Sequence, residues 1–231
     1  MLQGSFVRDS EGQAALFGEI ASTPTSLNTM RAGITYAGLV EGGETQQSDA
    51  VSAYTQHILT PADGDPVWIR LPADWMLPCH AKFADPVFLL LRPLYGHPAA
   101  GRIWEKHLSD IMSSFGWFPI ENFPNTWITR SPETQKEKEK KEAPPWVVAS
   151  VYVDDFVLNG RGLKPLWDEI RKHLTLSDPE PIGKLLGCKF SVSRGGPVTT
   201  ITQNMSEFIS QAVYNLEHVI EAGNLKLADT P

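Results

Sequence analysis

The segment that decides the fold is residues 146–160, which read WVVASVYVDDFVLNG. Apolar, mostly β-branched runs flank the adjacent Asp154 and Asp155, as in two buried strands joined by a tight turn. Burying two carboxylates in such a setting is unfavourable without a compensating partner. A hairpin that presents both aspartates at its tip to a divalent metal ion removes this conflict. Strand alternation puts Tyr152 and Asp154 on one face and Val153 on the other, with Asp155 at the turn.

A third carboxylate is expected nearby, because two-metal phosphoryl transfer uses a ligand that bridges both ions from a neighbouring strand. The best candidate is Asp49, within the segment QSDAVSAY at residues 47–54. Tyr54 follows this aspartate in the same segment. Two interpretations of Tyr54 stay open: a residue beneath the sugar of a bound nucleotide, or a partly buried core aromatic with a hydrogen-bonded hydroxyl.

The composition is typical of a globular protein. The chain has 231 residues, of which 42% are hydrophobic and 20% charged, enough for one large domain or two small ones. No apolar run is long enough to cross a membrane, and no signal peptide is recognisable. Cys79 and Cys188 lie far apart, which predicts free thiols in a reducing compartment. Cys79-His80 resembles half of a zinc site, but no second pair of ligands completes it.

The formal net charge of −7 is unusual for a nucleic-acid enzyme, since phosphate contacts normally require a basic surface. It argues against strong autonomous binding of nucleic acid unless basic side chains gather on one face. The tract at residues 136–142, KEKEKKE, has two interpretations, a basic patch or a solvated loop. Its interleaved glutamates favour the loop.

Hydrophobic periodicity predicts helices and strands in mixed order, which indicates an α+β architecture. A cap before a proline predicts a helix start at Ser22-Thr23-Pro24, and a capping-box arrangement at Asn204 and Glu207 opens a last helix that is expected to stop at Gly223. The other expected helices cover 103–115 and 166–174. Residues 1–20 are typical of strand and turn, and further strands are expected at 67–71, 87–91 (a buried type), 127–129, 146–151, 185–192 and 198–202.

Several further blocks make the chain similar to a known family. It resembles the reverse transcriptase of copia-type long-terminal-repeat retrotransposons over nearly its whole length, with the family's motifs in order. The block LYGHPAAGRIW at 94–104 is similar to the family's Leu-Tyr-Gly-Leu-Lys-Gln-Ala-Pro-Arg-x-Trp. The other blocks are QGSFVR at 3–8, DAVSAY at 49–54, VWIRLP at 67–72, YVDD at 152–155, LLGC at 185–188 and DTP at 229–231.

This resemblance implies a fold and a division of the chain. The fold would be a right-hand polymerase palm, a ferredoxin-like antiparallel sheet with packed helices, with partial fingers and the start of a thumb. Residues 1–48 and 61–95 would be fingers-like, and residues 49–60 and 96–184 would form the palm. Residues 185–231 would form the primer-contacting hairpin and the thumb start.

The resemblance also implies an activity and its site. The protein would be an RNA-directed DNA polymerase that transfers a nucleotide from a dNTP to a primer 3′-hydroxyl. Asp49, Asp154 and Asp155 would bind two Mg²⁺ ions, which Mn²⁺ could replace. Tyr54 would be a steric gate against a ribose 2′-hydroxyl, and Tyr152 would pack near the primer end. The nucleotide-binding residues would be Ala50, Tyr54, Gly96, Arg102 and Tyr152. Its partners would be a primed RNA or DNA template and dNTPs, without a membrane, in an intracellular location that is cytoplasmic (a virus-like particle) or nuclear.

Three departures from the family pattern predict that this chain is weakly active or inactive on its own. Pro98 and Ala99 replace a lysine and a glutamine that position nucleotide and template, and Gly101 replaces a proline. The chain begins after the family's basic fingers residues, and it stops before a full thumb and the ribonuclease H domain. The alternatives are a catalytically inactive retroelement relic or a domesticated nucleic-acid-binding module. A third is an unrelated metal-dependent hydrolase or cyclase on a similar fold.

Overall fold

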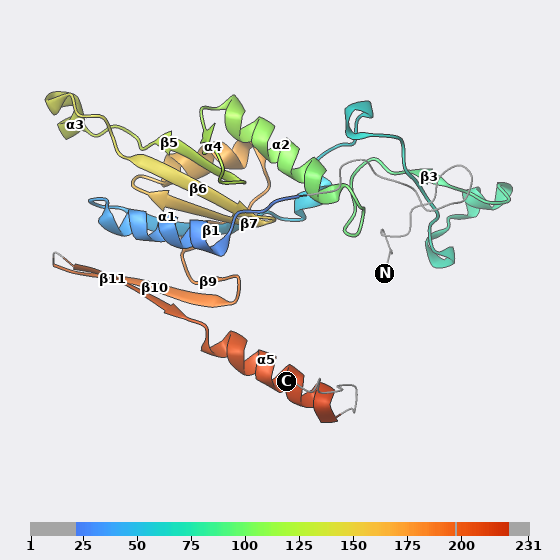
Figure 1. Ribbon diagram of the computed structural model, residues 1–231. Helices are drawn as coiled ribbons and strands as arrows, with labels where there is room; N and C mark the ends of the chain where they lie inside the picture. The colour runs from blue at the N-terminus through green and yellow to red at the C-terminus, as the bar shows by residue number, and fades with distance from the viewer. Residues whose placement is uncertain (1–21, 197, 222–231) are drawn as a thin grey trace.

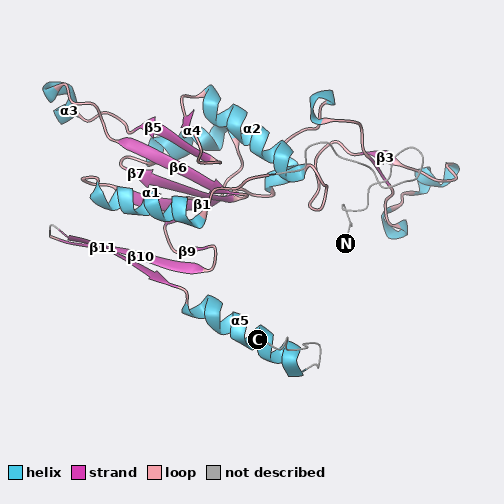
Figure 2. Cartoon of the chain, viewed as in Figure 1, coloured by secondary structure: helices cyan, strands magenta, loops and turns pink. Residues whose placement is uncertain are grey.

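The computed structural model describes residues 22–196 and 198–221. They form a mixed α+β fold, as the sequence predicts, around a mostly antiparallel six-stranded sheet (Figures 1 and 2). The strand order across this sheet is β4-β5-β6-β7-β1-β8. Its strands are β1 (Glu44–Asp49), β4 (Phe118–Pro119), β5 (Thr126–Arg130), β6 (Trp146–Tyr152), β7 (Asp155–Gly160) and β8 (Glu180–Pro181). The α-helices in the described ranges are α1 (Leu27–Leu39), α2 (Ala100–Ser114), α3 (Gln135–Lys140), α4 (Lys164–His173) and α5 (Ser206–Glu221).

The central strands β6 and β7 are apolar on both faces because hydrophobic layers cover both faces. Helices α2 and α4 lie on one side of the sheet and α1 on the other (Figure 1). Phe156 and Leu158 of β7 face the first layer, whereas Val157 faces the second, together with Met30 and Ile34 of α1. The first layer also contains Val147, Ala149, Val151, Trp104, Leu108, Met112, Trp167 and Ile170.

The contact between α1 and the sheet includes a buried polar residue. Asn159 of β7 is fully buried and accepts a hydrogen bond from the Thr45 hydroxyl (3.0 Å). A Cβ atom at Gly33 of α1 would lie only 2.6 Å from Asn159 Nδ2. Glycine at this position therefore allows α1 to approach the sheet closely.

A separate three-stranded sheet lies below α1 in the view of Figure 1, and α5 continues from it. Its order is β11-β10-β9, with β9 (Lys184–Leu185), β10 (Cys188–Gly195) and β11 (Val198–Asn204). The single strand expected at 185–192 is wrong, because Leu186 and Gly187 form a turn with positive φ. The last helix is present, but it begins at Ser206, because Asn204 is the last residue of β11. The Asn204 side chain accepts from the Ser206 N–H (2.8 Å), and the Glu207 carboxylate pairs with Lys184 (3.0 Å) in place of the expected capping box. The expected stop of this helix at Gly223 lies outside the described residues.

Residues 61–92 extend to one side of the main sheet as an arm, which carries β3 (Figure 1). The arm contains short 3₁₀ helices and the two-stranded sheet of β2 (Trp68–Ile69) and β3 (Phe88–Leu89). The prediction of a buried strand at 87–91 is wrong, since Val87, Leu89 and Leu91 are exposed. An apolar run predicts burial only if a second layer covers the strand, and this two-stranded sheet leaves those side chains open to solvent.

Two other predictions about elements are corrected. The first helix begins at Leu27 rather than near Ser22, because the Ser26 hydroxyl accepts from the Thr29 N–H (3.0 Å) and caps it. The tract expected to be a loop at 136–142 contributes to α3 instead. Its start is fixed by a capping box between Thr134 and Glu137. Across residues 22–196 and 198–221, no helix combines the length and the apolar character needed to span a bilayer.

Candidate metal centre

The candidate centre lies where β1 ends and β7 begins. Asp49 is the last residue of β1 and is directly paired with Asp155, the first residue of β7. Directly opposed residues on neighbouring strands project to the same face, so both carboxylates lie on the same face as Val157. Asp154 adjoins this pair in the turn between β6 and β7. The structure therefore brings Asp49 next to Asp154 and Asp155, which lie far from it in the sequence.

The geometry of the hairpin differs from the expectation in one respect. Tyr152 pairs with Asp155, so the two-residue turn consists of Val153 and Asp154, and Asp155 belongs to the strand. Val153 has a φ of 59°, a left-handed conformation that is unfavourable for a β-branched residue. The alternation of side chains between the two faces of β6 therefore ends at Tyr152, so the expected placement of Val153 and Asp154 on opposite faces of a continuous strand does not apply.

Two hydrogen bonds hold this unfavourable turn. Trp104 of α2 donates its indole N–H to the carbonyl of Val153 (2.6 Å), and Ala50 donates its backbone N–H to the carbonyl of Asp154 (2.8 Å). Ala50 is itself buried and forms a β-bridge with Leu176. The predicted nucleotide-binding Ala50 thus fixes the backbone that carries the aspartates.

The other side of Asp49 is anchored to the chain after α4. Ser177 donates its backbone N–H to the Asp49 carbonyl (2.8 Å), and its hydroxyl accepts from the Asp49 N–H (2.9 Å). The backbone of Asp49 is therefore held on both sides, by Asp155 and by Ser177, whereas its side chain is exposed.

The surroundings of Asp155 disfavour the ionised form of its carboxyl group. Burial raises the pKa of Asp155 from 3.8 to about 6, together with a hydrogen bond to Asp49 and the negative charges of Asp154 and Asp49. A divalent cation would reverse this effect, because it favours ionised carboxylates and oxygen is the ligand that Mg²⁺ prefers. The contacting pair Asp49 and Asp155 therefore fits a magnesium ion.

The fit is more limited for Asp154. Among residues 22–196 and 198–221, no group of three or more His, Cys, Asp or Glu side chains is arranged to hold a metal ion. Asp154 thus contributes negative charge beside the pair of Asp49 and Asp155, but its side chain does not complete a three-ligand set with them. Asp49 and Asp155 are in contact and Asp154 lies beside them in the turn, and a metal-binding role for the three stays a prediction.

Two tyrosines lie within the electrostatic reach of the aspartates. Tyr54, in the 3₁₀ helix η1 (Ala53–Gln56), packs against Tyr95 with ring centroids 4.7 Å apart. Burial raises the pKa of Tyr95, as do the charges of Asp154 and Asp49. Burial likewise raises the pKa of Tyr54, and Tyr95 and the charge of Asp154 raise it further. Tyr54 packs against the core, as the second interpretation expects, while the interpretation as a residue beneath a nucleotide sugar stays a prediction.

Tyr95 was not among the residues selected from the sequence, although it stands in the block at 94–104. The signal that could have found it is the following Gly96, which has a φ of 89° in a turn closed by the His97 N–H and the Leu94 carbonyl (2.9 Å). This turn orients Tyr95 next to Tyr54. The role of Gly96 that the structure shows is therefore conformational.

The remaining predicted residues lie around this centre. Arg102 of α2 donates to the carbonyl of Asp63 (3.1 Å), so it holds the loop that follows Tyr54. Tyr152 is half-buried in the hydrophobic layer on the α1 side of the sheet. The structure shows both as parts of the framework around the aspartates.

The residues that depart from the family pattern form a closely packed helix start. Ala99 and Ala100 are buried where α2 begins. A Cβ atom at Gly101 would lie 2.7 Å from the Ser22 hydroxyl oxygen. A side chain at Gly101 would require the chain before α1 to move away from α2.

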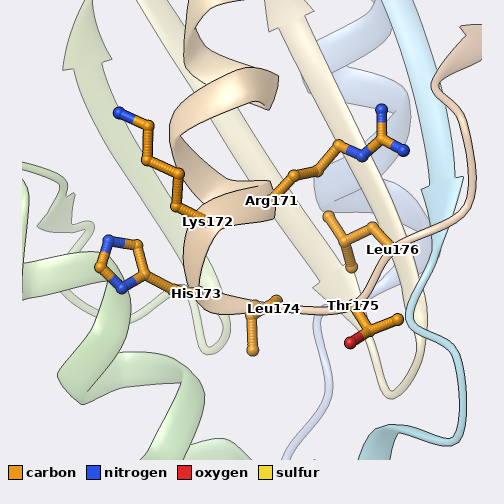
Figure 3. Close-up of a pocket in the computed structure, with 6 residues that line it drawn as sticks. All are labelled: Arg171, Lys172, His173, Leu174, Thr175 and Leu176. Carbon is orange, nitrogen blue, oxygen red and sulfur yellow. The ribbon is translucent and has the colours of Figure 1, made fainter.

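A shallow cavity of about 260 Å³ lies at the end of α4 and is lined by residues 171–176 (Figure 3). Its basic side chains are paired, since Arg171 contacts Asp178 and Lys172 contacts Glu169. The backbone of Thr175 accepts from the Val51 N–H (3.0 Å), which puts the cavity beside the segment that follows Asp49. These ion pairs leave little net positive charge to attract phosphate.

Comparisons of this chain with protein-family models, with curated proteins and with solved structures found no match. The interpretation of the site therefore depends on its own residues and their geometry.

Proposed function

We propose that this chain is the reverse transcriptase domain of a copia-type retrotransposon, an RNA-directed DNA polymerase. The observation that carries the proposal is the direct pairing of Asp49 with Asp155, beside Asp154 in a two-residue turn. This arrangement concentrates carboxylates from two separate motifs at one end of an antiparallel sheet. The order of the sequence blocks supports the family assignment.

The finer description of the fold belongs to the same proposal. The six-stranded sheet with α2 and α4 on one face would be the palm, and the arm at 61–92 would be part of the fingers. Sheet β9–β11 and α5 would be the primer-contacting hairpin and the start of the thumb. The substrates would be dNTPs and a primed RNA or DNA template, inside the cell.

In the proposed mechanism, Asp49 and Asp155 would hold Mg²⁺, with Asp154 adding negative charge beside them. Two bound Mg²⁺ ions would supply activation of the primer 3′-hydroxyl and neutralisation of the triphosphate and leaving pyrophosphate. Tyr54 and Tyr95 would form the wall against which the sugar of the incoming nucleotide lies. The bonds from Trp104 and Ala50 would keep the turn fixed, so that little reorganisation is needed when substrate binds.

The test is primer extension by the purified chain on primed RNA and DNA templates with dNTPs and Mg²⁺ or Mn²⁺. We expect only weak extension by the unchanged protein, because of its departures from the family pattern, and a loss of more than about 100-fold in Asp49→Asn and Asp154→Asn, since each removes a metal-centre charge. Asp168→Asn is the matched control, because Asp168 is an exposed aspartate on α4 paired only with Lys164. Absence of extension across a broad range of metal and salt concentrations would contradict the proposal for this chain.

A chain without turnover, either an inactive relic or a binding module, is the second candidate, favoured by the packed residues Ala99 and Gly101. The net charge of −7 argues against strong nucleic-acid binding and so favours the relic, which would show neither binding nor extension. A gel-shift assay with the same primed template separates the two functions. Binding without extension supports the module, whereas binding with extension supports the polymerase. Hydrolysis of nucleoside triphosphates without a primer would instead indicate an unrelated metal-dependent enzyme.

A further inference from the structure

A second cluster of titratable side chains joins the loop after Tyr54 to α2. His57 Nδ1 lies 3.3 Å from His107 Nδ1, and the two ring centroids are 4.8 Å apart. On its other side, His57 Nε2 lies 2.9 Å from Asp63 Oδ2. The same carboxylate oxygen accepts from the Thr60 N–H (2.8 Å) and the Thr60 hydroxyl (2.7 Å). Asp63 is almost fully buried and His57 is mostly buried.

The proton positions in this cluster follow from its geometry. Burial tends to raise the pKa of Asp63, but hydrogen bonds from His57 and Thr60 outweigh it and lower the pKa to about 2. Asp63 is therefore an ionised acceptor, and His57 Nε2 must carry a hydrogen. Only one hydrogen can then lie between the two Nδ1 atoms, donated either by neutral His107 or by the imidazolium form of His57.

Protonation of both imidazoles to the cationic form breaks the contact between His57 and His107. If both imidazoles were protonated, two N–H groups of cationic rings would oppose each other across 3.3 Å. Burial lowers the pKa of His107, as does the charge of His57, while Asp110 and Asp63 act in the opposite direction. The side chain of Arg102 donates to the Asp63 carbonyl and that of Arg92 to the Gln56 carbonyl (3.2 Å), so two further cations border the loop.

The loop held by this contact leads directly from Tyr54. Tyr54 lies in η1, and His57 is the residue that immediately follows this short helix. Because η1 also packs against α2, the pair His57–His107 is a side-chain link between α2 and the segment that carries Tyr54.

We propose that His107 is a positioning residue that holds the Tyr54 segment against α2 through His57, and that protonation of both histidines releases this segment. The pKa of His107 is lowered in the folded protein, so its neutral form stabilises the fold. This contribution to folding stability is complete above about pH 6.5 and is lost as the pH falls below that value. A pH-dependent selection of the nucleotide sugar by Tyr54 would follow, and this consequence alone rests on the proposed polymerase function.

The structural test is hydrogen exchange of residues 53–63 at about pH 7.5 and about pH 5.5, corrected for intrinsic exchange rates. We expect protection to fall roughly tenfold at the lower pH in the unchanged protein, because the released segment opens locally. In His107→Asn the side-chain amide keeps a neutral hydrogen-bonding group near the Nδ1 position, so protection should be retained at both values. His218→Asn is the control, since His218 is exposed on α5 and bonds to Tyr214 of its own helix. Equal losses of protection in the unchanged protein and in His107→Asn would overturn the proposal.

A second measurement needs no variant and no enzymatic activity. The histidine ring protons and the Tyr54 ring protons are followed by NMR as the pH is lowered. The proposal requires the ring-proton signals of Tyr54 to shift at the pH at which the His57–His107 pair takes up the proton that makes both rings cationic. Tyr54 signals that stay constant through this step would refute it, whether or not the protein extends a primer.

Discussion

Substitution of Asp155 by asparagine should stabilise the metal-free protein. Asp155 is half-buried beside Asp49, and its pKa is raised from 3.8 to about 6 by burial and by the neighbouring carboxylates. A difference of about two between folded and unfolded pKa values corresponds to about 3 kcal/mol against folding when the group is ionised. Solvent screening of a half-exposed group reduces this to about 1–2 kcal/mol.

The pH dependence has a definite sign. A raised folded-state pKa means that the protonated form stabilises the protein at low pH, and this contribution is lost as the pH rises from about 4 through about 6. Asp155→Asn lacks this titration and keeps an amide that can donate to Asp49. The variant should therefore be more stable than the unchanged protein above about pH 7, with a difference that narrows toward pH 4.

The assay is urea unfolding in the presence of a chelator, followed by tryptophan fluorescence at several pH values. Asp168→Asn serves as the control, because an exposed ion pair contributes at most about 1 kcal/mol. Adding Mg²⁺ should stabilise the unchanged protein and should have a smaller effect on Asp155→Asn. An asparagine variant that is less stable than the unchanged protein above pH 7, or a difference independent of pH, would refute this reasoning.

Three further predictions concern the framework of the site, and each is measured by chemical unfolding. Val153→Asn should stabilise the protein by about 1 kcal/mol, because asparagine tolerates the left-handed turn better than valine; a loss of stability would contradict the assigned strain. Trp104→Phe removes the indole donor to the Val153 carbonyl and should cost about 1–3 kcal/mol, and an unchanged midpoint would count against that bond. Gly33→Ala should destabilise the protein by about 1–2 kcal/mol, because the alanine Cβ would meet Asn159 and this clash outweighs the better helix propensity of alanine. A stabilised variant would show that α1 can move away from the sheet.

Elements with a strong, uninterrupted periodicity could be predicted from the sequence. The apolar face from Ile103 to Met112 marks α2, and the runs around residues 154–155 mark β6 and β7. Local hydrogen bonds decided two of the cases that failed. The side chain of Ser26, rather than Ser22, caps α1, and the capping box at Thr134 converts a charged tract into α3.

The candidate site was predictable in its identity but less so in its geometry. Asp49, Asp154 and Asp155 were selected because paired carboxylates in an apolar hairpin need a partner, and the register of β1 against β7 brings them together. The position of the turn could not be deduced, because it depends on Val153 adopting a positive φ that its residue type disfavours. Tyr95 was missed because its proximity to Tyr54 arises from tertiary packing between separate segments.

Anomalous diffraction from crystals soaked in Mn²⁺ shows whether Asp49, Asp154 and Asp155 form a divalent-metal centre. We expect anomalous density within coordination distance of the carboxylates of Asp49 and Asp155, next to Asp154, and its loss in crystals of Asp49→Asn. Saturating Mn²⁺ that produces density only elsewhere on the protein, or none at this end of the sheet, would contradict it.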